Sequence, residues 1–186
     1  MDSTTLRCAI FVLATLIFTF ISRRALQNPR AHGFYRYFAF IGITSLVLHN
    51  QPAWFEQPFS ALHCLSWLLL AISIALVTHG VILLIRYGGQ SSRPASPENL
   101  AFENTQHLVV NGLYRYIRHP MYAALLLLAW GAFLKRVDVF TIVVICVVTL
   151  AIYLTAKVEE QENIAFWGDD YVKYKLSSRM FIPFIL

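Results

Sequence analysis

Charged residues are scarce in this chain of 186 residues. Only 13% of the residues are charged and 58% are hydrophobic, whereas about 25% of an average soluble domain is charged. Together with a mean hydropathy of +0.58, this deficit predicts an all-α integral membrane protein and argues against a soluble enzyme. The length is that of a single domain.

Spacings typical of metal and nucleotide sites are also missing. The three cysteines lie far apart inside apolar stretches, and the six histidines show no ligand spacing, so the sequence predicts neither a disulfide nor a metal site. It contains no glycine-rich nucleotide fingerprint and no phosphate loop. We expect no metal and no nucleic-acid partner.

What the chain has instead is a series of apolar segments. They lie at about 6–22, 36–50, 60–86, 120–134 and 137–156. The third and the fifth have the length of a membrane span, about 20 residues, and the first is expected to be retained as an anchor. The fourth is too short to span alone and is predicted to form a helical hairpin with the fifth, turning at Lys135 and Arg136. The prediction is therefore about five transmembrane helices.

Lysine and arginine concentrate on one side of such a five-span topology. Segments 23–36 and 86–118 and the tail after the fifth span hold twelve of them, and the opposite side holds three. By the positive-inside rule, the C-terminal tail is predicted to be cytosolic. Residues 1–86 are predicted to be a three-span scaffold, 87–119 a cytosolic loop that begins the site, and 120–186 the hairpin and cytosolic tail. The Gly/Ser/Pro-rich stretch 87–100 predicts a loop.

The most informative stretch is NGLYRYIRHPMY, residues 111–122. It places Arg115, Arg118 and His119 directly before an apolar run, where charge is unfavourable unless it binds something or reaches water. Pro120 fits the first turn of a helix. This arrangement predicts a polar pocket at the mouth of a helix, and an interfacial belt of basic and aromatic residues is the alternative.

A group of acidic residues follows the fifth span. Because the two ends of a hairpin meet, Glu159 and Glu160 are expected to lie beside Arg118 and His119. Adjacent helical residues point about 100° apart, so at most one of the two glutamates is expected to face the pocket. A solvated helix end is the alternative interpretation, and the aromatic tail that follows fits an interfacial amphipathic helix.

These blocks resemble the isoprenylcysteine carboxyl methyltransferase family. LVVNGLYRYIRHPMY, an apolar hairpin, VEEQENIAFWGDDYVKYK and IPFI occur in the family's order over residues 106–186. The Arg-His-Pro-x-Tyr block alone also occurs in phospholipid and thiol methyltransferases and, more loosely, in sterol reductases. Its combination with the tail favours the carboxyl methyltransferases.

The resemblance implies a multi-pass enzyme of the endoplasmic reticulum membrane that uses S-adenosylmethionine. Such enzymes methylate the C-terminal carboxylate of a prenylated cysteine during CaaX processing, so the implied partners are prenylated proteins or prenylcysteine-like lipids. The implied cofactor-binding positions are Leu108, Val109, Tyr114, His119, Pro120, Met121, Tyr122 and Glu159.

The chain departs from the family's pattern at two positions. Thr155 stands where the family has an arginine that meets the substrate carboxylate, and Ala124 replaces a glycine. Arg118, as a planar fork, and Lys157, as a point charge, are the remaining candidates for carboxylate contacts. Three alternatives stay open: a small lipophilic carboxylate, thiol, amine or phospholipid acceptor; a sterol-reductase-like enzyme with a nicotinamide cofactor; and a non-enzymatic membrane scaffold.

Overall fold

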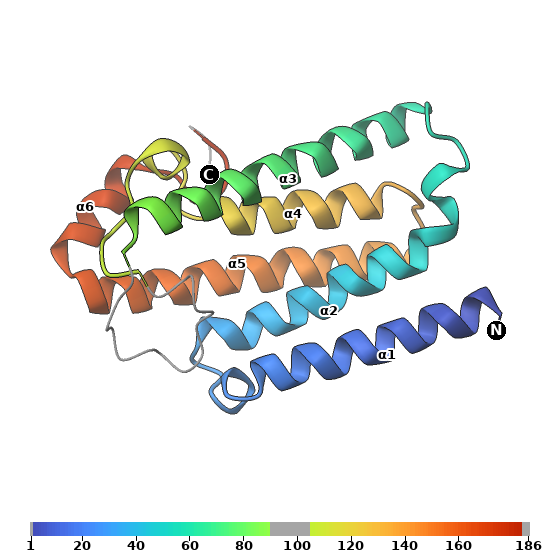
Figure 1. Ribbon diagram of the computed structural model, residues 1–186, viewed down its shortest axis with the longest axis horizontal. Helices are drawn as coiled ribbons and strands as arrows, with labels where there is room; N and C mark the ends of the chain where they lie inside the picture. The colour runs from blue at the N-terminus through green and yellow to red at the C-terminus, as the bar shows by residue number, and fades with distance from the viewer. Residues whose placement is uncertain (1, 90–104, 184–186) are drawn as a thin grey trace.

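A computed structural model describes residues 2–89 and 105–183, which form a bundle of helices without a strand (Figure 1). The long elements are α1 (Ser3–Ser22), α2 (His32–Asn50), α3 (Ala61–Tyr87), α4 (Pro120–Phe133) and α5 (Val139–Trp167). Helix α6 (Asp169–Ser177) and the short 3-10 turns η1 (Ala25–Gln27), η2 (Gln51–Phe55) and η4 (Gly112–Arg115) lie at the ends of the bundle. The predicted all-α fold is confirmed.

Helices α1, α3 and α5 are each long and apolar enough to cross a membrane. Helix α4 is apolar but only 14 residues long, about 21 Å, whereas the hydrocarbon core of a bilayer is about 30 Å thick. Helix α5 continues beyond the predicted apolar segment 137–156 and ends at Trp167. One rigid helix therefore connects the apolar span to the acidic residues.

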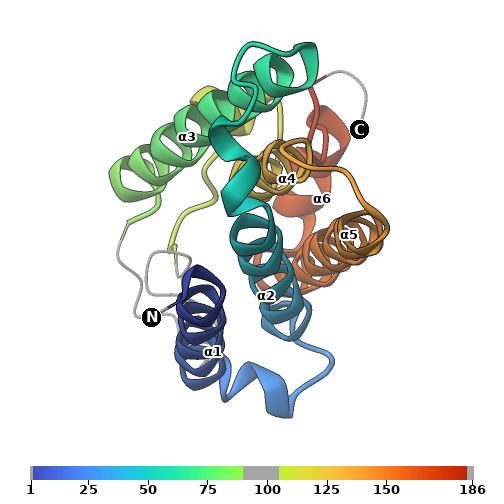
Figure 2. The same cartoon turned by 90° about the vertical axis from the view of Figure 1, so that its right-hand side faces the viewer.

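Helix α4 lies at the centre of the bundle, with α3 on one side and α2 and α5 on the other (Figure 2). Close approach to α3 depends on small residues, since a Cβ atom on Gly131 would lie 2.8 Å from Cγ of Leu70. The hydroxyls of Ser66 and Ser73 donate to the carbonyls of Gly131 and Ala124, each at 2.7 Å. Small residues and interhelical hydrogen bonds are what hold helices together in membranes.

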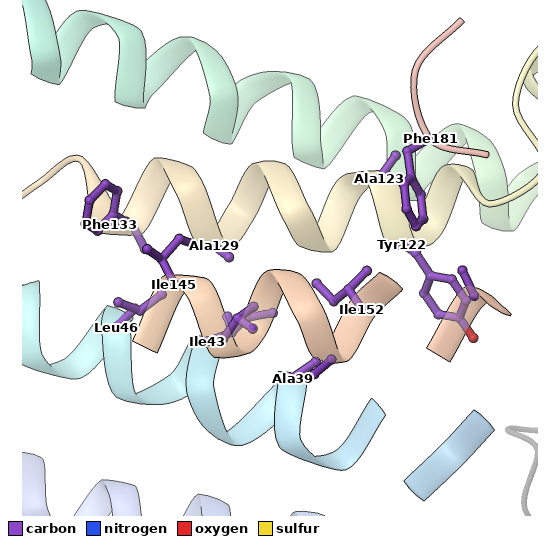
Figure 3. Packing of buried hydrophobic residues seen from close by; sticks show 14 of the residues in the cluster. Ala39, Ile43, Leu46, Tyr122, Ala123, Ala129, Phe133, Ile145, Ile152 and Phe181 are labelled. Carbon is purple, nitrogen blue, oxygen red and sulfur yellow. The ribbon is translucent and has the colours of Figure 1, made fainter. Parts of the chain in front are cut away.

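The main hydrophobic core fills the space between α2, α4 and α5 (Figure 3). Its labelled members are Ala39, Ile43 and Leu46 of α2, Tyr122, Ala123, Ala129 and Phe133 of α4, Ile145 and Ile152 of α5, and Phe181 of the C-terminal tail. The tail thus packs on the same core as the helices. Helix α1 contributes no buried residue and lies at the edge beside α2.

The connection from α3 to the site is described only in part. The predicted loop at 87–100 lies mostly outside the described residues, and the division into 1–86, 87–119 and 120–186 stays a prediction. Directly after α3 the chain turns at Gly89, which has a φ of +66°, a conformation that favours glycine.

The predicted hairpin turn at Lys135 and Arg136 is confirmed, since both lie between α4 and α5. Asn50, at the end of α2, is fully buried beneath this turn. Its side-chain amide donates to the carbonyls of Ala132 at 2.8 Å, Phe133 at 3.3 Å and Arg136 at 3.1 Å. One side chain thus binds carbonyls that the end of α4 leaves without helical partners.

Replacing Asn50 with leucine is expected to lower the free energy of unfolding by about 1–3 kcal/mol, because three carbonyls would each lose one of their donors. Reversible unfolding in detergent, followed by tryptophan fluorescence, measures this change. Gln51→Leu is the matched control, since Gln51 is the next residue and is exposed. Equal effects of the two substitutions would contradict the assigned role of Asn50.

Candidate functional site

The candidate site lies at the end of the bundle where α4 begins, α5 ends and α6 packs (Figure 1). A cavity opens there between these elements and the segment that leads into α4. Its volume of about 80 Å³ is below the roughly 300–1,000 Å³ of pockets that enclose a whole small molecule. The described residues therefore enclose only part of a ligand of cofactor size.

The chain just before α4 is held in place by the C-terminal tail. The Arg179 N–H donates to the Tyr116 carbonyl at 2.9 Å, and the Arg118 N–H donates to the Arg179 carbonyl at 2.7 Å. The His119 N–H donates to the Met180 carbonyl at 3.1 Å. This parallel pairing fixes the backbone from which Arg118 and His119 project.

His119 lies between two carboxylates. Its ring stacks on Tyr122, with centroids 5.4 Å apart, and the residue is 5% exposed. Nδ1 is 3.9 Å from Oε2 of Glu159, and Nε2 is 3.8 Å from Oε1 of Glu160. Both separations exceed hydrogen-bond length, so the imidazole has acidic neighbours without being tied to either of them.

The two adjacent glutamates have different surroundings, as their positions on one helix require. The Glu159 side chain lines the cavity and is 27% exposed. The Glu160 side chain is 1% exposed and accepts a hydrogen bond from Nε of Arg118 at 2.8 Å. Its second oxygen lies 2.7 Å from Nζ of Lys175. Two cations thus offset the desolvation of one buried carboxylate.

Arg118 joins three parts of the structure. Besides Glu160 on α5, its Nη1 donates to the Lys175 carbonyl of α6 at 3.1 Å and to the Ser178 carbonyl of the tail. The sequence predicts that the planar guanidinium group of Arg118 pairs with a substrate carboxylate, as a fork with two donors. In the structure, the fork is occupied by groups of the protein itself, and the side chain is 8% exposed.

The residues predicted to bind the cofactor converge on the cavity. Its lining includes Leu108, Val109, Tyr114, His119, Pro120, Met121, Tyr122 and Glu159, together with Arg118. Lys157, the other predicted carboxylate contact, lines a separate groove with Arg118, Lys175 and Arg179. The geometry therefore separates Lys157 from the other predicted residues, and the roles of all of them stay predictions.

Six further cavity residues are missing from the sequence prediction: Leu84, Thr105, Asn163, Trp167, Tyr171 and Tyr174. The rings of Trp167 and Tyr171 stack 6.0 Å apart, and the Tyr174 hydroxyl donates to the Tyr114 carbonyl at 2.6 Å. The sequence suggests that this aromatic tail lies on the membrane surface, but in the structure Tyr171 and Tyr174 are buried and line the cavity. The sequence contains a pattern that indicates the last four of these residues. Starting from Glu160, they follow one another at steps of three or four residues, the spacing of one face of a helix.

Burial raises the pKa of the Tyr171 and Tyr174 phenols above their ordinary value, about 10. Both hydroxyls therefore remain protonated at neutral pH. Aromatic walls beside the carboxylate of Glu159 suit a ligand that carries a flat ring and a positive charge. No group of three metal-ligating side chains occurs within residues 2–89 and 105–183.

Residues 63–167 match the model of a family described as phospholipid methyltransferase. A methanethiol S-methyltransferase of Crocosphaera subtropica is 27% identical over 149 residues, which cover 78% of this chain and 53% of the relative. A protein of the same name from Pseudomonas deceptionensis is 25% identical over 124 residues, which cover 67% and 44%. The chain spans about half the length of these curated relatives. No solved structure matches.

The adjacent glutamates allow a matched test of the site's construction. Glu160→Gln is expected to lower the free energy of unfolding by about 3–5 kcal/mol, because it breaks a buried pair and leaves Arg118 and Lys175 without their anion. Glu159→Gln should leave stability close to wild type. Thermal and denaturant unfolding in detergent compare the two variants, and similar losses would show that Glu160 is not the structural member of the pair.

Proposed function

The chain belongs to the phospholipid methyltransferase family, and from this premise we propose that it transfers a methyl group from S-adenosylmethionine to a small lipophilic thiol at the membrane interface. The observation that carries the proposal is the convergence of the eight predicted cofactor positions on one cavity. The names of the curated relatives favour a thiol as the acceptor.

The cavity fits this cofactor in charge and surface. S-adenosylmethionine supplies a methyl group attached to a positively charged sulfonium. Glu159 offers a partly exposed carboxylate, and aromatic rings such as those of Tyr122 and Trp167 attract cations through their faces. Val109 and Met121 add apolar surface against which a flat ring can pack. We expect the eight predicted positions to hold the cofactor.

A thiol acceptor must lose a proton before it reacts, since its pKa is about 8.5 and the thiolate is the nucleophile. Among the described residues that line the cavity, His119 is the only imidazole. Its Nε2 has no hydrogen-bond partner among the described residues, so this nitrogen can accept a proton. We therefore assign His119 as the proton acceptor. The thiolate sulfur then bonds to the methyl carbon as the sulfonium–methyl bond breaks.

A prenylcysteine carboxylate, implied by the resemblance to the isoprenylcysteine enzymes, has weaker support. Thr155 occupies the position of the family's arginine, but it is 1% exposed, and its hydroxyl donates to the Ala151 carbonyl at 2.7 Å within α5. That position faces the interior of the bundle and does not line the cavity. CaaX processing and a location in the endoplasmic reticulum are proposals that depend on this second acceptor. The cytosolic location of the tail is a proposal that depends on the distribution of basic residues.

Cofactor binding tests the role of Glu159. Glu159→Gln is expected to weaken binding of S-adenosylmethionine about tenfold, because one charge–charge contact in a partly buried site contributes about 1.4 kcal/mol or more. Isothermal titration calorimetry in detergent measures the affinity. Asp170→Asn is the matched control, since the Asp170 side chain is 81% exposed and lies outside the cavity. Unchanged affinity in Glu159→Gln would remove Glu159 from the site.

Methyl transfer tests the acceptor and the role of His119. Membranes that contain the chain should transfer labelled methyl from S-adenosylmethionine to methanethiol and release a volatile labelled thioether. His119→Gln should reduce this rate about 10²–10⁴-fold, the usual contribution of a general base. The alternative outcome is methylation of N-acetyl-S-farnesylcysteine to a base-labile product, with no methylation of methanethiol. That result would establish a carboxylate as the acceptor.

A further inference from the structure

A second depression lies on the other side of Arg118 from the cavity. It has a volume of about 390 Å³ and runs between the end of α5, helix α6 and the tail. Four cationic side chains line this groove, those of Arg118, Lys157, Lys175 and Arg179. No carboxylate belongs to its lining among the described residues.

Only part of this positive charge is neutralised by the protein. Arg118 and Lys175 share the single carboxylate of Glu160. Lys157 and Arg179 form no ion pair with any described residue, and Nζ of Lys157 lies 5.5 Å from the centre of the Tyr153 ring. The groove therefore carries an excess of positive charge that suits an anion.

The other lining residues show which kind of anion fits. Tyr153 is part of the long apolar helix α5, and Lys157 lies one helical turn beyond it, where the acidic end of the helix begins. Val172 and Leu176 of α6 are 40% and 79% exposed. Cations at one level and exposed apolar side chains beside them are the combination that binds lipid headgroups and chains together.

We propose that this groove binds an anionic phospholipid, with the headgroup phosphate between Lys157 and Arg179 and an acyl chain along Tyr153 and Leu176. This site is separate from the proposed cofactor cavity. The Arg118–Glu160 pair forms the wall between the two. The proposal does not depend on the identity of the methyl acceptor.

Lipid retention by the purified full-length chain tests the proposal. Native mass spectrometry would compare retention of added phosphatidylglycerol with that of phosphatidylcholine. A cation near a membrane surface contributes about 1 kcal/mol to binding of anionic lipid, which corresponds to about fivefold in affinity. The double variant Lys157→Gln/Arg179→Gln should therefore bind phosphatidylglycerol at least tenfold more weakly.

The control is Lys173→Gln, which removes one positive charge from α6 and is compared with the single variants Lys157→Gln and Arg179→Gln. The Lys173 side chain is 78% exposed and does not line the groove, so this variant should retain phosphatidylglycerol like the wild type. The charge-preserving variant Lys157→Arg/Arg179→Lys should also retain it, which separates loss of the site from loss of the fold.

Three results would overturn the proposal. The first is an equal loss in Lys173→Gln, which would indicate diffuse attraction to the surface. The second is equal retention of phosphatidylcholine and phosphatidylglycerol by the wild type. The third is displacement of the lipid by equimolar glycerol phosphate, which would show a site for soluble phosphates and no contribution from the acyl chain.

Discussion

The arrangement of the site depends on one buried carboxylate, that of Glu160. A charge removed from water is strongly unfavourable unless opposite charges and hydrogen bonds surround it. Its partners, Arg118 and Lys175, come from the segment before α4 and from α6. Through Arg118 the same network reaches the Ser178 carbonyl of the tail. Four separate parts of the chain are thus brought to one point at the end of the bundle, and the cavity is the space enclosed beside it.

Helix geometry separates the structural carboxylate from the one that is free to meet a ligand. Glu159 and Glu160 are neighbours in the chain, yet one lines the cavity and the other is sealed in its wall. His119 lies within 4 Å of both, so the imidazole connects the network that holds the site together with the surface that faces a ligand. A rigid α5 that continues past the apolar span makes this arrangement possible.

The same wall has a proposed binding surface on each side. The cavity combines aromatic rings with a carboxylate, which suits a cation. The groove combines four cations, which share one carboxylate among the described residues, with exposed apolar residues, and this combination suits an anionic amphiphile. The proposed reaction would bring together a water-soluble methyl donor and an acceptor that partitions into lipid. A site at the end of short helix α4, next to the apolar spans, fits such a reaction.

The apolar helices and the hairpin turn at Lys135 and Arg136 could be predicted from the sequence, because hydrophobic runs and short connections are local properties. The set of cavity residues from Leu108 to Glu159 was predicted from the resemblance to a known family. The sequence did not reveal that Glu160 is the buried member of the pair or that Lys175 is its second partner, nor the burial of Tyr171 and Tyr174 or the orientation of Thr155. Those features depend on contacts between segments far apart in the chain, such as the pairing of Arg118 with Arg179. The spacing of polar residues within one helix indicates which of them share a face, and packing against other elements decides which face is buried.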